Sequence, residues 1–303
     1  TDTAQRSGGN AAIIRIHKKE KAIAVTVDSS VNYCKAHPLT GGKQIVCESW
    51  RNLISVGAKP IAITNCLNFG NPENSKVMGE FVECLIGIKE ACEFLDYPVV
   101  SGNVSFYNGT NKKNIDPTPV IGGVGLILET KNKINHFLKK EENIILKVGK
   151  TFGHLYQSVF FKEIYSIVEG PPPEVNLANE KNNGETVLRL INDKLISSVH
   201  DISSGGLILA LAEMSMPSEY GLKIDKPTKL FNLMEYYFGE DQGRYLLEIE
   251  PKNFEKITKI LSENNIFNEK VAIVQKNKFE IPGELNINIK DLYNINNTWY
   301  NNY

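Results

Sequence analysis

The sequence predicts two domains that mix helices and strands, of the α/β or α+β class. Its 303 residues are enough for two domains of ordinary size. Short apolar runs alternate with longer segments in which apolar residues recur at helical spacing. A Lys- and Asn-rich stretch over residues 130–142 separates two such series. We therefore expect domains at residues 1–130 and 142–285, followed by a tail at 286–303.

The elements of the first domain follow from these patterns in chain order. Residues 11–30 hold two apolar runs around a charged turn, which predicts a hairpin. Residues 41–57 and 76–95 are expected to be helices. The second of these carries an apolar face of Met78, Phe81, Val82, Leu85, Ile86 and Ala91. Strands are predicted around residues 60–64, 97–102 and 119–129, and polar loops follow the first two.

The second domain repeats this mixture of elements. Residues 143–149 predict a strand, and a Pro-rich loop leads into a helix that ends near residue 191. Residues 195–214 predict a strand, a Gly-rich turn and a helix, and residues 245–261 a strand and a helix. Residues 271–276 predict a further strand. The tail carries no strong signal.

Composition excludes several classes of function. Lys and Arg number 34 against 35 Asp and Glu, so the chain lacks the overall positive charge of a nucleic-acid-binding protein. No window approaches the roughly 18 apolar residues of a membrane span, and no signal peptide is visible. The five cysteines lack metal-ligand spacing and indicate reduced thiols in a cytoplasmic protein. The chain begins at Thr1 without methionine, which predicts a piece of a longer protein.

Three polar segments come directly after apolar strands: "TNCLNFGNP", "SGNVSFYN" and "HDISSGGL". Polar groups beyond strand ends commonly form ligand sites. Asn oxygens, Ser hydroxyls and exposed Gly backbone suit a phosphorylated ligand with Mg²⁺. Neither a P-loop nor a dinucleotide fingerprint is present. The "GGVG" run at residues 122–125 lies inside a strand, which favours close packing over phosphate binding.

Two further segments each leave two interpretations open. In "HDISSGGL", Asp201 could bind a metal beside a helix N-terminus that receives an anion, or Asp201 or Ser203 could simply cap that helix. "FGEDQGR" could bind a metal or phosphate through Glu240 and its neighbours, or form a solvated turn. His200 is interpreted as a satisfied core residue. No Ser/His/Asp or Cys/His catalytic set is visible.

These segments, in this order, resemble one family. The segments at residues 26–73, 100–108, 117–127, 153–164, 171–191, 199–214 and 238–249 are similar to the second half of phosphoribosylformylglycinamidine synthases, in the large subunit of the small bacterial type. The resemblance implies an α+β pair of aminoimidazole-ribonucleotide-synthetase-like (PurM-like) domains. The first domain's sheet would pair with the sheet of an N-terminal half to form a barrel.

The resemblance also implies a reaction in purine biosynthesis. The family converts formylglycinamide ribonucleotide to formylglycinamidine ribonucleotide with ATP, Mg²⁺ and glutamine-derived ammonia. ATP phosphorylates the amide oxygen, and ammonia then displaces phosphate. The implied partners are the N-terminal half, a glutaminase subunit and a small accessory subunit. The family's catalytic His belongs to the absent half, so we expect no catalytic residue in this chain and no activity from it alone.

The matching positions assign roles to four residues. Asn65 and Gly102 would contact the nucleotide, Asn103 would bind the metal, and Ser105 would contact the substrate. By pseudo-symmetry, three acids would belong to an auxiliary nucleotide site: Asp28, Asp201 and Glu240.

The chain departs from the family at three positions where an acid is usual: Asn10, Asn65 and Ser204. The loss of these acids predicts that the auxiliary site is empty or degenerate. Asn65 can still hydrogen-bond a nucleotide, but a carboxylate is lost there.

Two other functions compete with this assignment. One is another ATP-dependent enzyme of the same superfamily, such as a selenophosphate synthase or thiamine-monophosphate kinase, but the aspartate-rich loop of those enzymes is not visible. The other is a non-catalytic scaffold that only completes the barrel. In either case the apolar strands of the first domain predict that the chain alone forms a homodimer.

Overall fold

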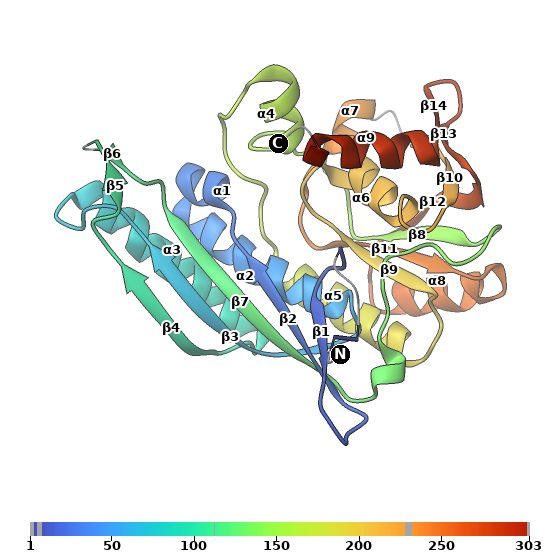
Figure 1. Cartoon of the computed structure of the whole chain (residues 1–303), viewed down its shortest axis with the longest axis horizontal. Coiled ribbons are helices and arrows are strands. Elements are labelled where there is room, and N and C mark those ends of the chain that lie inside the picture. The colour runs from blue at the N-terminus through green and yellow to red at the C-terminus, as the bar shows by residue number, and fades with distance from the viewer. Residues whose placement is uncertain (1–2, 5–7, 112, 228–231, 302–303) are drawn as a thin grey trace.

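The computed structural model of the chain contains two large sheets, which lie next to each other (Figure 1). It describes residues 3–4, 8–111, 113–227 and 232–301. The first sheet has five strands, in the order β1 (Ala12–Arg15), β2 (Ala22–Asp28), β7 (Thr118–Ile127), β3 (Lys59–Asn68) and β4 (Val99–Ser105). Only β3 and β4 run parallel; the other neighbours are antiparallel. β5 (Gly109–Thr110) and β6 (Lys113–Asn114) form a small separate ribbon.

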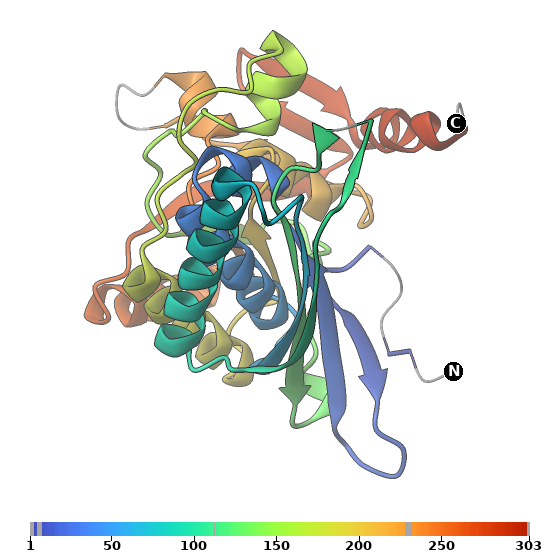
Figure 2. The same cartoon turned by 90° about the vertical axis from the view of Figure 1, so that its left-hand side faces the viewer.

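Helices cover only one face of the five-stranded sheet, as the nearly edge-on view in Figure 2 shows. They are α1 (Val31–Ala36), α2 (Pro38–Ile54) and α3 (Ser75–Leu95). Glycines let α2 and α3 pack closely, because a Cβ on Gly42 would overlap the Cys84 carbonyl and one on Gly87 the Leu39 carbonyl. In β7 buried and half-exposed residues alternate, as expected for a strand with one covered face.

The opposite face of this sheet is uncovered and largely apolar; we call it the outer face. Val27 is 72 % exposed and Ile61 46 % exposed, and Ile14 and Ile23 also expose much of their surface. Monomeric soluble proteins seldom leave a contiguous apolar surface of this kind open to water. The outer face is therefore a surface that another body is expected to cover.

The second sheet has seven strands: β14 (Leu285–Asn288), β13 (Lys278–Ile281), β10 (Tyr220–Ile224), β12 (Asn268–Lys276), β8 (Ile144–Val148), β11 (Arg244–Ile249) and β9 (Ser198–Ile202). Its helices are α4 (Val159–Tyr165), α5 (Leu177–Asn192), α6 (Gly206–Ser215), α7 (Leu233–Phe238), α8 (Phe254–Glu263) and α9 (Ile289–Asn301). Two short 3₁₀ turns are η1 (Thr130–Asn132) and η2 (Pro251–Asn253). Within the described ranges, no helix is long and apolar enough to cross a membrane.

One hydrophobic core joins the two sheets. Helix α2 packs against α5, and Trp50 on α2 lies so close to Gly184 on α5 that a Cβ there would overlap its ring. The same core cluster contains Leu53 of α2 and Leu190 of α5. A second, smaller core lies between helices α6 and α7 and the seven-stranded sheet, and it includes residues of strands β10, β12 and β13.

The structure confirms the α+β class and the N-terminal hairpin, and it corrects three predictions. The polar segments after residues 64 and 100 begin inside strands β3 and β4, which continue to Asn68 and Ser105, and only the remainder of each segment is a loop. The predicted face of α3 is partly wrong: Met78, Val82 and Ile86 are more than a third exposed, and a neighbouring stripe is buried instead. The tail after residue 286 completes β14 and forms α9.

Candidate functional site

The four residues expected to contact nucleotide, metal and substrate lie on the adjacent strands β3 and β4; we call them the β3–β4 group. Asn65 stands opposite Gly102 in the parallel ladder, and Asn103 and Ser105 follow on β4. A Cβ on Gly102 would overlap the Asn65 side-chain oxygen, so only glycine leaves that amide in its present position. The structure thus brings together residues 37 positions apart in sequence.

The side chains of the group divide between the two faces of the sheet. Asn65 lies on the helix-covered side and lines a 410 Å³ cavity with Leu85 and Ile88 of α3. Because neighbouring side chains alternate along a strand, Asn103 and Ser105 lie on the outer face. Asn103 is exposed, and the Ser105 hydroxyl is held by Asn108 at 3.2 Å.

The exposed position of the β3–β4 group has a chemical consequence. A hydroxyl and an amide on an open surface compete with water, so they bind a ligand weakly unless a second surface encloses it. The group borders the apolar outer face that is expected to be covered. Asn103 and Ser105 therefore form one wall of a site, whereas Asn65 lies on the opposite, helix-covered face of the sheet.

Glu240, expected in an auxiliary site, takes part in an internal network. Its carboxylate accepts hydrogen bonds from the Tyr33 hydroxyl at 2.6 Å, the Val159 amide at 2.7 Å and the Gly205 amide at 2.8 Å. Val159 begins α4 and Gly205 caps α6. The anion expected at the N-terminus of α6 is thus the protein's own Glu240 carboxylate, and neither Asp201 nor Ser203 caps this helix through its side chain.

Asp28 and Glu240 line one cavity of about 360 Å³ between the two units, with Ser204 also in its wall. Asp28 accepts hydrogen bonds from Thr26 and Asn52, both at 2.8 Å. Burial nevertheless raises the pKa of Asp28 to about 6. Asp201 lines a different cavity, of about 650 Å³, with Asn10 and His200. The three auxiliary residues therefore do not converge on one cavity.

Arg51 is a central residue that sequence reasoning missed. It is fully buried on α2, and its guanidinium bonds Glu180 at 2.6 Å, Gln242 at 2.9 Å and Glu48 at 3.1 Å. Its Nε lies 3.9 Å from the Asp201 carboxylate. We call these five residues the Arg51 cluster. The spacing of Glu48 and Arg51, three residues apart on one helix, was the sequence signal that could have identified the pair.

In the Arg51 cluster, burial and the Arg51 guanidinium act in opposite directions on the pKa values of the acids. Burial raises the pKa of Glu48 to about 8, although Arg51 opposes that effect. Burial also raises the pKa of Glu180, with Arg51 again opposing it. An internal guanidinium thus stands among the acids between the two units.

Asn10 and His200 complete the surroundings of Asp201. The Asn10 side-chain amide donates to the Asp201 carboxylate and lies 3.0 Å from Nδ1 of His200. His200 also bonds Glu213 at 2.8 Å through Nε2. His200 is therefore a hydrogen-bonded, mostly buried residue, as the sequence predicted.

The described residues supply only part of a set of metal ligands. The Asn103 amide oxygen is a ligand type that Mg²⁺ accepts, but a single neutral ligand does not hold the ion. Among the described residues, no group of three or more His, Cys, Asp or Glu side chains could bind a metal. The described residues therefore do not complete a metal site, and we derive no chemical step through the metal.

Comparison with known families agrees with the two-unit architecture. Residues 8–127 match the N-terminal domain of AIR synthase related proteins, and residues 140–281 match their C-terminal domain. The chain belongs to the AIR synthase related family. Both family domains are present, and together they account for both sheets.

Curated relatives identify the branch of this family. The chain is 55 % identical over 302 residues to the phosphoribosylformylglycinamidine synthase subunit PurL of Pelagibacter ubique, and 43 % identical to that of Nitrobacter hamburgensis. All of this chain is matched in both, but only 41 % of each relative. The chain thus spans about two fifths of the length of these relatives.

Solved structures agree on the fold. "T. maritima PurL complexed with FGAR" matches with a TM-score of 0.79 at 16 % identity, covering 96 % of this chain and 49 % of that one. A chain of the "HypE-HypF complex" matches with a TM-score of 0.67 at 16 % identity, covering 92 % of both chains. At such identities the likeness concerns the fold alone.

Proposed function

We propose that this chain is part of a phosphoribosylformylglycinamidine synthase and supplies one wall of its active site. The relatives with that name are similar over the whole chain, at 55 % and 43 % identity. The structural observation that carries the proposal is the position of Asn103 and Ser105 beside an uncovered apolar face. The remainder of the polypeptide would cover this face and complete the site.

The proposed reaction joins ammonia from glutamine to formylglycinamide ribonucleotide at the expense of ATP. Within it, Asn65 and the Gly102 backbone would contact ATP, Asn103 would offer its amide oxygen to Mg²⁺, and the Ser105 hydroxyl would bind the substrate. Solved structures of similar fold are described as PurL complexes with ATP and with FGAR, which supports these ligand classes. The phosphorylation step spreads charge over phosphoryl oxygens, so positioned donors contribute by stabilising that charge.

We propose the same partners that the family implies: the N-terminal half, a glutaminase subunit and a small accessory subunit. A structure of similar fold is described as "PurLQS from Thermotoga maritima". The five cysteines are free thiols, four of them buried, which fits a cytoplasmic location. The auxiliary residues Asp28, Asp201 and Glu240 would have a structural role here, because Glu240 bonds protein groups and Asp201 faces Arg51 and Asn10.

The test is steady-state kinetics of the full-length protein with ATP, substrate and ammonia. Asn103→Ala and Ser105→Ala are expected to lower turnover by about tenfold or more. Ser101→Ala is the matched control, because Ser101 lies on the same strand and the same face. Near-normal turnover in both site variants would leave only the scaffold function for this chain.

A further inference from the structure

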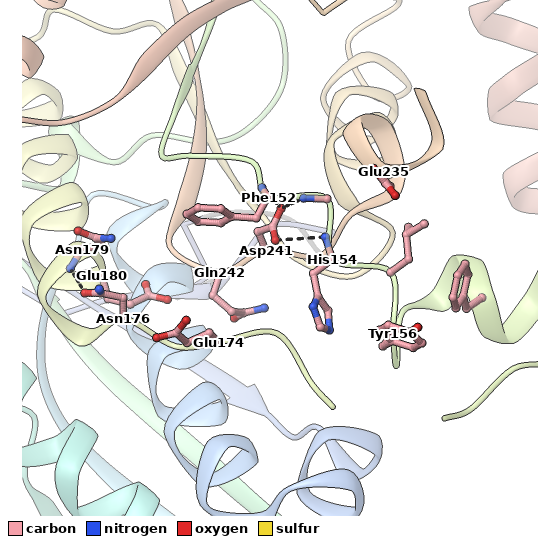
Figure 3. Close-up of a pocket in the computed structure, with 13 residues that line it drawn as sticks. Phe152, His154, Tyr156, Glu174, Asn176, Asn179, Glu180, Glu235, Asp241 and Gln242 are labelled. Atoms are coloured by element: carbon pink, nitrogen blue, oxygen red, sulfur yellow. Dashed lines mark hydrogen bonds between the residues drawn. The ribbon is translucent and has the colours of Figure 1, made fainter. Parts of the chain in front are cut away.

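A cavity of about 580 Å³ in the second unit uses its buried acids within the protein (Figure 3). Asp241 accepts hydrogen bonds from the backbone amides of Phe152 at 2.8 Å and Gly153 at 2.9 Å. Glu180 bonds Arg51 at 2.6 Å. These two acids are occupied by groups of the protein itself, whereas the polar side chains at the end of β4 border the uncovered outer face.

Asn108, in the turn that follows β4, joins the ends of two strands. Its side-chain Nδ2 donates to the carbonyl oxygens of Phe69 and Ser105, each at 3.0 Å. Phe69 directly follows β3, Ser105 ends β4, and the Phe69 amide donates to the Ser105 carbonyl at 3.0 Å. The Asn108 side chain thus fixes the position of Ser105 relative to β3.

The turn that brings Asn108 back to Ser105 has a strained backbone at Tyr107. The φ angle of Tyr107 is 59°, in the left-handed region that bulky residues rarely adopt. Its amide donates to the Gly70 carbonyl at 2.9 Å, which holds the turn against the segment after β3. A conformation of this kind persists only where its surroundings impose it, and such residues cluster at functional sites. Here it places the Asn108 side chain beside the Ser105 hydroxyl.

The hydrogen bonds of Asn108 decide which way the Ser105 hydroxyl points. A side-chain amide nitrogen carries two hydrogens, and the two carbonyl oxygens use both. The Ser105 hydroxyl oxygen lies 3.2 Å from Oδ1 of Asn108 and 3.1 Å from Nδ2. Because the hydrogens on Nδ2 are already used, the hydroxyl donates its own hydrogen to Oδ1. Ser105 therefore keeps its lone pairs free to accept a hydrogen bond from a ligand.

Asn68 repeats this arrangement on β3. It stands opposite Ser105 in the parallel ladder, so the two side chains share a face of the sheet. Its Nδ2 donates to the carbonyl oxygens of Cys66 at 3.3 Å and Thr118 at 3.4 Å. Among the described residues, the only donor near its Oδ1 is the Cys66 thiol, at 4.0 Å. The end of this wall thus presents two hydrogen-bond acceptors, the Ser105 hydroxyl and the Asn68 amide oxygen.

We propose that Asn108 is a positioning residue of the synthase site, which sets the Ser105 hydroxyl to accept a hydrogen bond from the substrate. The part of the substrate that meets Ser105 is then an N–H or O–H donor and not its phosphate, since two acceptors repel phosphate oxygens. Asn68 supplies the second acceptor for the same part of the substrate. This inference rests on the proposed function, in which Ser105 contacts the substrate.

The test is steady-state kinetics of the full-length protein with ATP, substrate and ammonia. Asn108→Ala should raise the KM for the substrate about tenfold and change the KM for ATP less than about twofold. Asn114→Ala is the matched control, because Asn114 accepts from the Asn71 amide at 3.0 Å and so supports the same turn without a printed bond to Ser105. Its KM for the substrate should stay normal.

A double variant separates positioning from a merely structural role. In a Ser105→Ala background, Asn108→Ala should change the KM for the substrate by less than about twofold, because its effect passes through the missing hydroxyl. Effects that multiply in the double variant would overturn the proposal. Equal KM values for Asn108→Ala and Asn114→Ala would overturn it as well.

An isosteric pair of variants tests the direction of the hydrogen bond. Ser105→Asp and Ser105→Asn have the same shape, but only the aspartate is restricted to accepting and carries a negative charge. If the substrate offers a donor, the KM of Ser105→Asp should be no more than about threefold above that of Ser105→Asn. A larger excess would mean that Ser105 meets an anion, and would overturn the proposal.

Failure of this inference is distinguishable from failure of the proposed function. If the unchanged full-length protein does not catalyse the synthase reaction, both fail. If it is active and any of the three contrary results is obtained, the role of Asn108 and the direction of the Ser105 hydrogen bond are refuted and the synthase function stands.

Discussion

Replacing Arg51 by methionine tests whether the Arg51 cluster stabilises the contact between the two units. Arg51 is fully buried, and its main partner Glu180 is almost completely buried. Methionine fills part of the space but leaves a buried carboxylate without its cation. Removing one partner of such a pair costs about 3–5 kcal/mol. We expect Arg51→Met to lower the free energy of unfolding by this amount and the melting temperature by about 5–8 °C.

The assay is thermal and urea unfolding of the 303-residue chain. Arg189→Met is the control, because Arg189 is exposed on α5, and it should change stability by less than about 0.5 kcal/mol. The double variant Arg51→Met/Glu180→Gln removes the stranded charge together with the guanidinium. It should be more stable than the sum of the two single changes predicts, by about 1 kcal/mol or more.

Two results would refute this reasoning. A loss below about 1 kcal/mol in Arg51→Met would mean that water reaches Glu180 and replaces the guanidinium. Strict additivity in the double variant would mean that Arg51 and Glu180 are not coupled.

Two further predictions concern pH and assembly. Burial raises the pKa of Glu48 from 4.5 to about 8, so between these pH values the unfolded chain has lost this proton while the folded chain keeps it, and the free energy of unfolding falls as pH rises. Glu48→Gln should therefore stabilise the protein more at pH 8 than at pH 5. An equal effect at both pH values would contradict the shift in pKa. The isolated 303-residue chain should form a two-fold dimer through the outer face, burying about 1,600 Å² in total. In light scattering, Val27→Asp on the outer face should yield the 33.9 kDa monomer, and the control Val168→Asp, away from that face, should remain a dimer. A monomer of the unchanged chain would refute the predicted dimer.

The sequence predicted elements well where a single apolar stripe marks them. The hairpin at β1–β2, the long strand β7 and the helix α2 all have such a pattern. Helix α3 has apolar residues on two neighbouring stripes, so periodicity could not tell which one faces the sheet. Close packing at "GGVG" was predicted correctly: a Cβ on Gly123 would overlap the Ser49 and Tyr97 side chains.

The site was predictable only in part. The β3–β4 group came from family resemblance, and the structure adds the face on which each side chain lies. Arg51 was missed because an arginine in a helix normally lies at the surface, whereas here three of its partners, Glu180, Gln242 and Asp201, belong to the second unit. The 580 Å³ cavity in the second unit was missed for a similar reason: its aromatic and acidic residues come from five segments that the sequence does not relate.

The three hydrogen bonds to Glu240 limit how this chain can move. One carboxylate fixes the start of α4, the start of α6 and Tyr33 of α1, and so links both units at one point. A hinge between the units would have to break the Tyr33–Glu240 bond and the Arg51 cluster together. Opening and closing around a ligand would therefore take place where the outer face meets its covering partner, with this chain moving as one rigid body.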